Sequence, residues 1–254
     1  MPRAKKKSGN GYAPVPQGMS VKMMNRKKPI DKSYMTDIQP LTDNQKTAFD
    51  EYKAGKNLLL HGAAGTGKTF IMLYLALQEV LDENTSYEKI YIVRSLVPTR
   101  EIGFLPGDHE DKSYLYQIPY KNMVRYMFKM PDENSFEMLY DNLRAQETID
   151  FWSTSFIRGT TLDNAIVIVD EFSNLNFHEL DSMITRIGED CKIMFCGDIQ
   201  QTDLTRDAEK SGIADFIKIL EQMKSFACVE FDFKDIVRSG LVREYLIAKY
   251  NSGF

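Results

Sequence analysis

Short apolar runs recur along the chain, and several of them are apolar at consecutive positions. Their lengths suit β-strands rather than helices. Consecutive apolar residues are typical of the central strands of a parallel sheet, because both faces of such a sheet are covered. The runs predict five strands, at residues 58–60, 90–93, 166–169, 193–195 and 227–231.

Helical periodicity fills the intervals between these runs. Residues 69–83 carry apolar side chains at the spacing of one helix face, directly after the first run. Further segments with helix-like spacing lie at 42–55, 176–187, 212–223 and 241–250. Strands that alternate with helices predict an α/β domain, in which a parallel sheet with right-handed crossovers is flanked by helices.

Two stretches depart from this rhythm. Residues 97–161 are far more than one crossover needs, so we interpret them as an inserted helical and β subdomain. It contains helix-like stretches near 113–129 and 135–145 and a strand-like stretch at 148–152. Residues 1–39 lack apolar periodicity and predict a flexible N-terminal arm. The folded domain is therefore expected at residues 40–254.

Charge is distributed unevenly between the arm and the domain. Residues 1–33 hold nine of the 32 Lys and Arg residues but one of the 36 acidic residues. A basic arm on an acidic body could contact the phosphate backbone of a nucleic acid. It could equally solubilise the chain or fold onto the surface of a neighbouring subunit.

Composition also bears on location. No apolar run approaches the roughly 20 residues that cross a bilayer, and the N-terminus lacks the apolar stretch of a signal peptide. We therefore expect a cytoplasmic protein without a membrane partner. The three cysteines show no zinc-site or disulfide spacing and are predicted to be reduced core residues: Cys191, Cys196 and Cys228.

Residues 62–69 read GAAGTGKT, which fits the pattern GxxxxGK[ST] between a strand and a helix. Glycines in such a loop let backbone amides turn inward and hold phosphate oxygens at the helix N-terminus. Lys68 is predicted to reach the β- and γ-phosphates, and the Thr69 hydroxyl to bind magnesium. The pattern predicts ATP and Mg²⁺ as ligands, with the nucleotide bound by Gly62, Ala63, Ala64, Gly65, Thr66, Gly67, Lys68, Thr69 and Phe70.

Two acids follow the apolar run at 166–169. Asp170 is placed to hold the metal ion at the end of the strand. Glu171 comes next and is a candidate general base that activates the attacking water. An apolar strand that ends in two acids is also compatible with a solvated loop, but the phosphate-binding pattern upstream favours catalysis.

Three polar residues are further candidates. Gln201, at the end of GDIQQ (197–201), is suited to sense the γ-phosphate, unless this segment is only a polar turn. Arg238 could act as an arginine finger or be a surface arginine before a helix. The Gln45 amide could read the adenine edge, because it both donates and accepts hydrogen bonds.

Basic residues interleave with aromatic ones around the insertion. Arg94, Arg100, Lys121, Arg125 and Arg158 suit the phosphates of a single strand. Helical spacing of aromatics is more often core packing than base stacking. The aromatic residues concerned are Tyr114, Tyr116, Tyr120, Tyr126, Phe128 and Trp152.

The order of these motifs resembles the PhoH-like ATPases, which are relatives of the superfamily 1 helicase core. The short form with a basic arm is similar to members carried by tailed bacteriophages, where the location would be the host cytoplasm. The resemblance covers about residues 41–250. It rests on LTDNQ at 41–45, the phosphate loop, GFLPG at 103–107, FIRG at 156–159, the two acids, GDIQQ and DIVR at 235–238.

This resemblance implies a RecA-like P-loop fold and several functional roles. It implies that Gln45 contacts adenine, Gln201 senses the γ-phosphate and Arg238 is the finger. It also implies oligomeric rings, hexamers in particular, and an RNA-directed helicase activity. Two positions depart from the family pattern: Ser173 stands where a glutamine is usual, and Ser95 where a proline is usual. Both bear on coupling to nucleic acid more than on hydrolysis.

The function expected from the sequence is Mg-dependent ATP hydrolysis in a homo-oligomeric ring. We expect hydrolysis to be coupled to the binding, translocation or unwinding of RNA or another single-stranded nucleic acid. Because the chain has room for one nucleotide-binding domain, Arg238 could come from a neighbouring subunit. The alternative function is a nucleotide-gated assembly or adaptor protein that does not translocate on a strand.

Overall fold

A single parallel sheet organises the structure, a computed structural model that describes residues 30–94, 109–157, 159–199 and 207–252. The described strands follow the spatial order β3-β2-β4-β5-β1-β6, and all neighbouring pairs are parallel. The five predicted strands and the parallel sheet are thus confirmed. The strands are β1 (Asn57–Gly62), β2 (Lys89–Arg94), β3 (Ile149–Ser153), β4 (Ala165–Asp170), β5 (Lys192–Gly197) and β6 (Phe226–Phe231).

Consecutive apolar residues in the central strands serve two cores, one on each face of the sheet. Leu58 and Leu60 of β1 point into one core, whereas Leu59 points into the other. The same alternation holds in β4, where Ile168 and Val169 face opposite ways. Every residue of β4 and β5 is buried. The runs are therefore continuous in the sequence because both faces are covered by helices.

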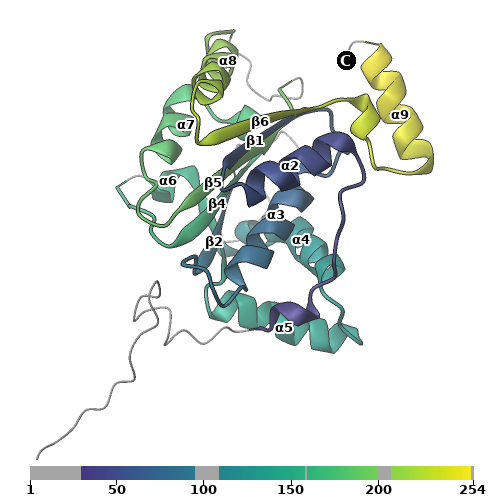
Figure 1. The fold of residues 1–254 in the computed structure, drawn as a ribbon, viewed down its shortest axis with the longest axis vertical. Coiled ribbons are helices and arrows are strands. Elements are labelled where there is room, and N and C mark those ends of the chain that lie inside the picture. The colour runs from purple at the N-terminus through teal and green to yellow at the C-terminus, as the bar shows by residue number, and fades with distance from the viewer. Residues whose placement is uncertain (1–29, 95–108, 158, 200–206, 253–254) are drawn as a thin grey trace, which may run out of the picture.

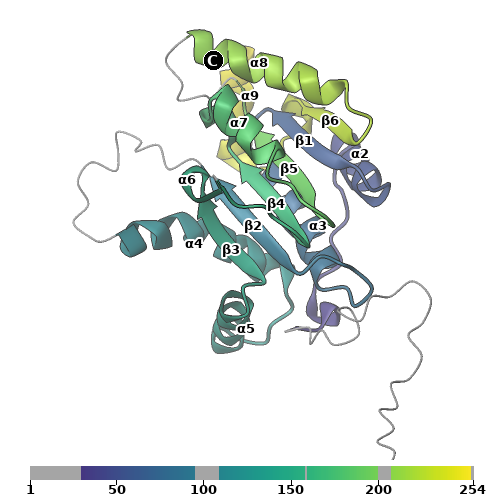
Figure 2. The ribbon, with the colours of Figure 1, turned by 90° about the vertical axis from the view of Figure 1, so that its left-hand side faces the viewer.

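Helices form a layer on each face of the sheet (Figures 1 and 2). The first core lies beneath α2 (Asp43–Lys53), α3 (Lys68–Val80), α4 (His109–Met127) and α5 (Glu133–Ala145). The second core lies beneath α6 (Thr154–Ile157), α7 (Phe177–Ile184) and α8 (Asp207–Glu221). The described residues also form three short 3₁₀ helices: η1 (Lys32–Tyr34), η2 (Phe172–Asn174) and η3 (Phe233–Asp235).

The segment interpreted as an insertion contributes to the main sheet. Within it, β3 pairs with β2 in parallel and forms an edge strand, with Phe151 opposite Ile92. The last residues of the expected arm also lie against the domain. Met35 is buried and pairs with Phe128 at the end of α4. Residues 30–39 therefore pack against the domain.

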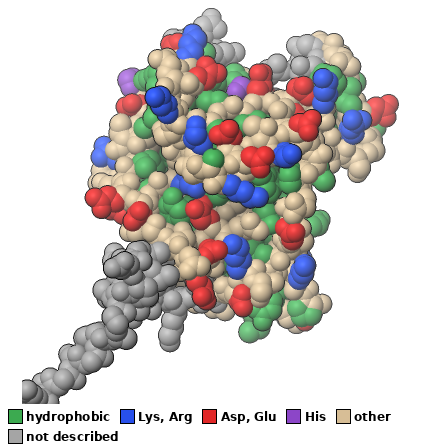
Figure 3. Space-filling view, in the orientation of Figure 1, with side chains coloured by type: hydrophobic (Ala, Val, Ile, Leu, Met, Phe, Trp, Pro, Cys, Tyr) green, Lys and Arg blue, Asp and Glu red, His purple; other side chains and the backbone are tan. Residues whose placement is uncertain are grey.

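Helix α9 (Gly240–Asn251) contacts η3 and lies outside the two helix layers (Figure 1). Three of its apolar side chains are exposed: Leu241, Val242 and Tyr245. On the face shown in Figure 3, acidic and basic side chains are interspersed. Among the helices described, none combines the length and apolarity needed to cross a bilayer.

Candidate functional site

The phosphate loop connects the end of β1 to the start of α3, as the sequence predicts. Gly62 has φ +105°, and a Cβ atom there would lie 2.1 Å from the carbonyl oxygen of Phe231 in β6. Gly65 and Gly67 also have positive φ angles, of 76° and 85°. Only glycine adopts such angles without strain, so these positions set the curvature of the loop.

Lys68 lies inside this loop. Its Nζ donates to the carbonyl oxygens of Gly62 (2.8 Å) and Ala63 (2.7 Å). Burial lowers the pKa of Lys68, while the carboxylates of Asp198, Asp170 and Asp235 act in the opposite direction. The ammonium group is thus held by carbonyls at the point where phosphate oxygens would bind.

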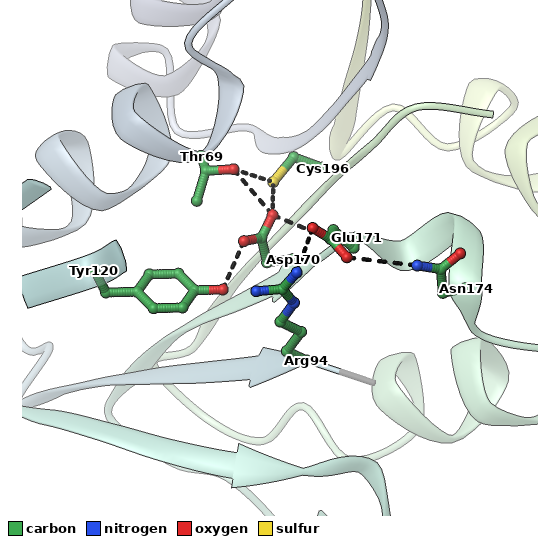
Figure 4. Close-up of polar contacts among 7 residues, drawn as sticks. All are labelled: Thr69, Arg94, Tyr120, Asp170, Glu171, Asn174 and Cys196. Carbon is green, nitrogen blue, oxygen red and sulfur yellow. Dashed lines mark hydrogen bonds and ion pairs between the residues drawn. The ribbon is translucent and has the colours of Figure 1, made fainter. Parts of the chain in front are cut away.

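Asp170, at the end of β4, gathers donors from three other elements (Figure 4). The Thr69 hydroxyl from α3 donates to Oδ1 at 3.0 Å, and the Cys196 thiol from β5 donates to the same oxygen at 2.9 Å. The Tyr120 hydroxyl from α4 donates to Oδ2 at 2.6 Å. Asp170 is itself buried, with 6% of its surface exposed. The carboxylate is therefore fixed in one orientation beside the Thr69 hydroxyl.

Burial keeps the groups around Asp170 in their donor form. Burial raises the pKa of the Cys196 thiol well above its usual value, and the Asp170 charge adds to the rise. The pKa of the Tyr120 hydroxyl is raised for the same two reasons. Both groups consequently keep their protons and can donate to Asp170.

Glu171 follows Asp170 in a left-handed conformation, with φ 52°. A side chain other than glycine in this region costs of order 1–3 kcal/mol and is often found at functional sites. Its Oε1 meets the Arg94 Nη2 at 2.5 Å, and its Oε2 accepts from Asn174 at 3.4 Å. Burial lowers the pKa of Arg94, but the hydrogen bond to Glu171 and the negative charges of Glu171 and Asp170 together outweigh burial, and the net pKa is raised. Glu171 is therefore engaged by β2 on one side and by η2 on the other.

Gln45 links the N-terminal end of α2 to the phosphate loop. Thr42 caps this helix, because its side chain accepts from the Gln45 backbone amide. The Gln45 side chain accepts from Leu41 N at 2.7 Å and donates to Thr66 O at 2.9 Å. The amide thus holds the loop in place in addition to lining the cavity described below.

The DIVR segment at residues 235–238 also contacts the phosphate loop of its own chain. Val237 N donates to Gly65 O at 3.1 Å. A Cβ atom on Gly65 would lie 3.1 Å from Arg238 Cγ and 2.8 Å from Leu246 Cδ1 of α9. Arg238 therefore lies beside the phosphate loop within a single chain.

These residues surround a cavity of about 910 Å³. That volume lies within the range of about 300–1,000 Å³ that is typical of small-molecule sites. Its polar lining includes Lys68, Thr69, Asp170 and Glu171. Apolar and aromatic side chains also line it: Ile38, Leu41, Phe49, Phe70, Met123 and Tyr126. A lining of both kinds suits a ligand that has a phosphate chain and a base.

Most of the predicted site residues come together here. Lys68, Thr69, Asp170 and Glu171 are within one cluster, and Gln45, Phe70 and Arg238 line the same cavity. Gln201 lies outside the described residues, as do the GFLPG motif, Arg100 and Arg158.

The sequence did not indicate three contacts of the acids. Tyr120, grouped there with aromatics for stacking or packing, is 2% exposed and points its hydroxyl at Asp170. Cys196 is buried as expected, but it also bonds to Asp170, whereas Cys191 and Cys228 are only half-buried. Asn174, which bonds to Glu171, carried no motif that could have identified it.

Residues 37–250 match the sequence profile of a family described as PhoH-like protein. A PhoH-like protein from Mycobacterium leprae is 30% identical over 212 residues, which cover 83% of this chain and 58% of that protein. A PhoH-like protein from Synechocystis is 35% identical, over 74% of this chain and 54% of its own length. Protein PhoH of Escherichia coli is 31% identical, over 84% and 59%. The chain thus spans little more than half the length of these relatives.

A similar arrangement occurs in a solved structure of the large terminase from a thermophilic bacteriophage in complex with ADP. The similarity covers 85% of this chain and 50% of the terminase chain. The TM-score is 0.48 and the sequence identity 12%.

Proposed function

Because the chain belongs to the family of PhoH-like proteins, we propose that it hydrolyses ATP with magnesium and couples hydrolysis to binding a single-stranded nucleic acid. The observation that carries the proposal is the convergence of Lys68, Thr69, Asp170 and Glu171 on one cavity. They supply a phosphate ligand, two metal ligands and a base, which is the set that phosphoryl transfer to water requires.

Substrate binding begins with the loop. Backbone amides at the start of α3 attract phosphate oxygens, and the helix dipole favours their negative charge. Lys68 exchanges the carbonyl oxygens of Gly62 and Ala63 for oxygens of the β- and γ-phosphates. The adenine ring is proposed to bind against the apolar side chains of the cavity, whose lining includes Gln45 and Phe70.

The donor set near Asp170 fits magnesium, which prefers oxygen ligands. The Thr69 hydroxyl and the Asp170 carboxylate lie 3.0 Å apart and supply these oxygens. These two oxygens would hold the ion, which would supply positive charge to offset the charge that develops on the phosphate oxygens. Tyr120 and Cys196 orient the carboxylate through their hydrogen bonds.

Glu171 is proposed to accept the proton of the attacking water. Its carboxylate must then reach the γ-phosphate end of the cavity, which Glu171 lines. Arg238 is proposed to neutralise charge on the transferring phosphoryl group, from its own chain or from a neighbouring subunit in a hexameric ring. The proposed role of Gln201 is to sense the γ-phosphate.

The test is ATP turnover by the purified protein, alone and with single-stranded RNA or DNA. Glu171→Gln serves as the control for contaminating ATPases, because it should bind ATP yet hydrolyse it very slowly. Turnover that a strand stimulates supports the proposal and identifies the polymer. Turnover that neither strand changes favours the nucleotide-gated adaptor. Equal turnover by Glu171→Gln and the wild type would remove Glu171 from the base role.

A further inference from the structure

The ion pair between Arg94 and Glu171 joins the proposed base to a strand that does not carry the phosphate loop. The phosphate loop follows β1. In the sheet, β5 lies between β1 and β4, and Glu171 directly follows β4. Arg94 ends β2, the neighbour of β4 on the opposite side. In Figure 4, Arg94 and Thr69 accordingly approach the two acids from opposite sides. The ion pair therefore holds the Glu171 carboxylate on the side of β4 that is farther from β1 and its phosphate loop.

We propose, on the basis of the function above, that Arg94 is a positioning residue that restrains Glu171, and that a phosphate of a bound single strand competes for Arg94 and releases Glu171. The pair is the resting arrangement of the site. Water activation by Glu171 requires this pair to open. Strand binding thereby accelerates hydrolysis without any strand contact to the nucleotide.

The pair has the properties that such a competition needs. The Arg94 side chain is 28% exposed and the Glu171 side chain 45% exposed, so both are open to solvent. A partly exposed ion pair is weak enough to be exchanged for another anion. A guanidinium group binds phosphate with two parallel hydrogen bonds, which favours a phosphodiester as the competing partner.

The backbone on either side of the pair is fixed. Arg94 is opposite Asp170 in the parallel register of β2 and β4, which holds the two strand ends together. Asp170 is held by Thr69, Cys196 and Tyr120. Opening the pair therefore requires side-chain rotation of Arg94 and Glu171 and leaves the metal ligand in place.

The experiment compares steady-state ATP turnover of the wild type, Arg94→Ala, Arg94→Lys and Arg144→Ala, with and without a single-stranded RNA or DNA oligonucleotide. Arg144 is the control, because its side chain is 29% exposed and pairs with Asp150 at 3.2 Å outside the site. It also donates to Ile149 O at 2.6 Å. Thermal unfolding establishes that each variant is folded. If Arg94→Ala does not fold, Arg94→Gln gives the same comparison.

We expect Arg94→Ala to raise strand-free kcat by roughly twofold to fivefold, the range that a partly exposed ion pair can supply. Its KM for ATP should stay near the wild-type value, and its stimulation by a strand should fall toward one. Arg94→Lys should keep part of the stimulation, because it retains a cation, and Arg144→Ala should behave as the wild type.

Two results would overturn the restraint. One is a fall in strand-free kcat of Arg94→Ala, which would mean that Arg94 orients Glu171 productively. The other is an unchanged strand-free kcat. Stimulation of Arg94→Ala equal to that of the wild type would overturn the competition by the strand. If no strand changes the turnover of the wild type, the nucleic-acid part of the proposed function is contradicted. The strand-free rates of the wild type and Arg94→Ala still decide whether Arg94 restrains Glu171.

Discussion

Replacing Tyr120 by phenylalanine removes one hydroxyl from the proposed metal site and little else. The ring is 2% exposed and packs against Phe151 with centroids 5.4 Å apart, and phenylalanine keeps that packing. The lost hydrogen bond, 2.6 Å long, is the one to Oδ2 of Asp170. Tyr120→Phe therefore isolates the contribution of that bond.

The expected loss follows from the charge of the acceptor. A hydrogen bond to a charged group contributes about 1.5–3 kcal/mol to the free energy of unfolding. For a chain of this size, each kcal/mol corresponds to about 2–4 °C in Tm, so Tm should fall by about 3–12 °C. Loss of a residue that orients a metal ligand typically weakens metal affinity or activity by about 10–100-fold. The magnesium concentration for half-maximal turnover should rise accordingly.

Thermal unfolding and magnesium titration of ATP turnover measure these two effects. Tyr34→Phe is the control, because 54% of the Tyr34 surface is exposed and Tyr34 does not line the cavity. A Tm for Tyr120→Phe within about 1 °C of the control would refute the stabilising role of the bond. An unchanged magnesium requirement would refute its role in orienting Asp170.

Three further changes test other parts of the structure. Lys68→Ala should weaken ATP binding by about 10–100-fold in a titration, because the phosphates lose a charged donor; unchanged affinity would contradict this role. Gly62→Ala should lower the free energy of unfolding by at least about 2 kcal/mol, since its Cβ would lie 2.1 Å from Phe231 O. A Cβ atom at Gly55 would contact nothing within 4 Å, so Gly55→Ala should lower the free energy of unfolding less than Gly62→Ala does. Denaturant titration of both variants measures the difference. Burial lowers the pKa of His61 below 6.5, so the unfolded chain binds a proton more readily than the folded one. The free energy of unfolding should therefore decline as pH falls below about 6.5. In His61→Gln, the fall of Tm with decreasing pH should be smaller than in the wild type.

The sequence predicted the sheet well because both of its faces are buried. Leu58, Leu59 and Leu60 form a continuous apolar run that periodicity alone identifies as a central strand. The packing of residues 30–39 was less predictable. Met35 is a single buried residue in a polar segment, and its pairing with Phe128 depends on where α4 ends.

The candidate site was predictable where its residues are close in sequence. Lys68 and Thr69 belong to one local pattern, and Asp170 and Glu171 directly follow one strand. The donors that hold Asp170 were not predictable in the same way. Tyr120 reaches it from 50 residues away, and only the packing of α4 against the sheet brings the hydroxyl there.

The pairing of Arg94 with Glu171 depends on strand order, which the pattern of apolar runs leaves open. The sequence places each residue at the end of a strand, and in a parallel sheet all such ends meet the same edge. Whether the two charges touch depends on whether β2 adjoins β4 or lies farther away. The observed order makes them neighbours, with Arg94 opposite Asp170. The arginine that the sequence suggests for nucleic-acid phosphates therefore also pairs with the proposed base, and the proposed control of hydrolysis by a strand rests on this dual position.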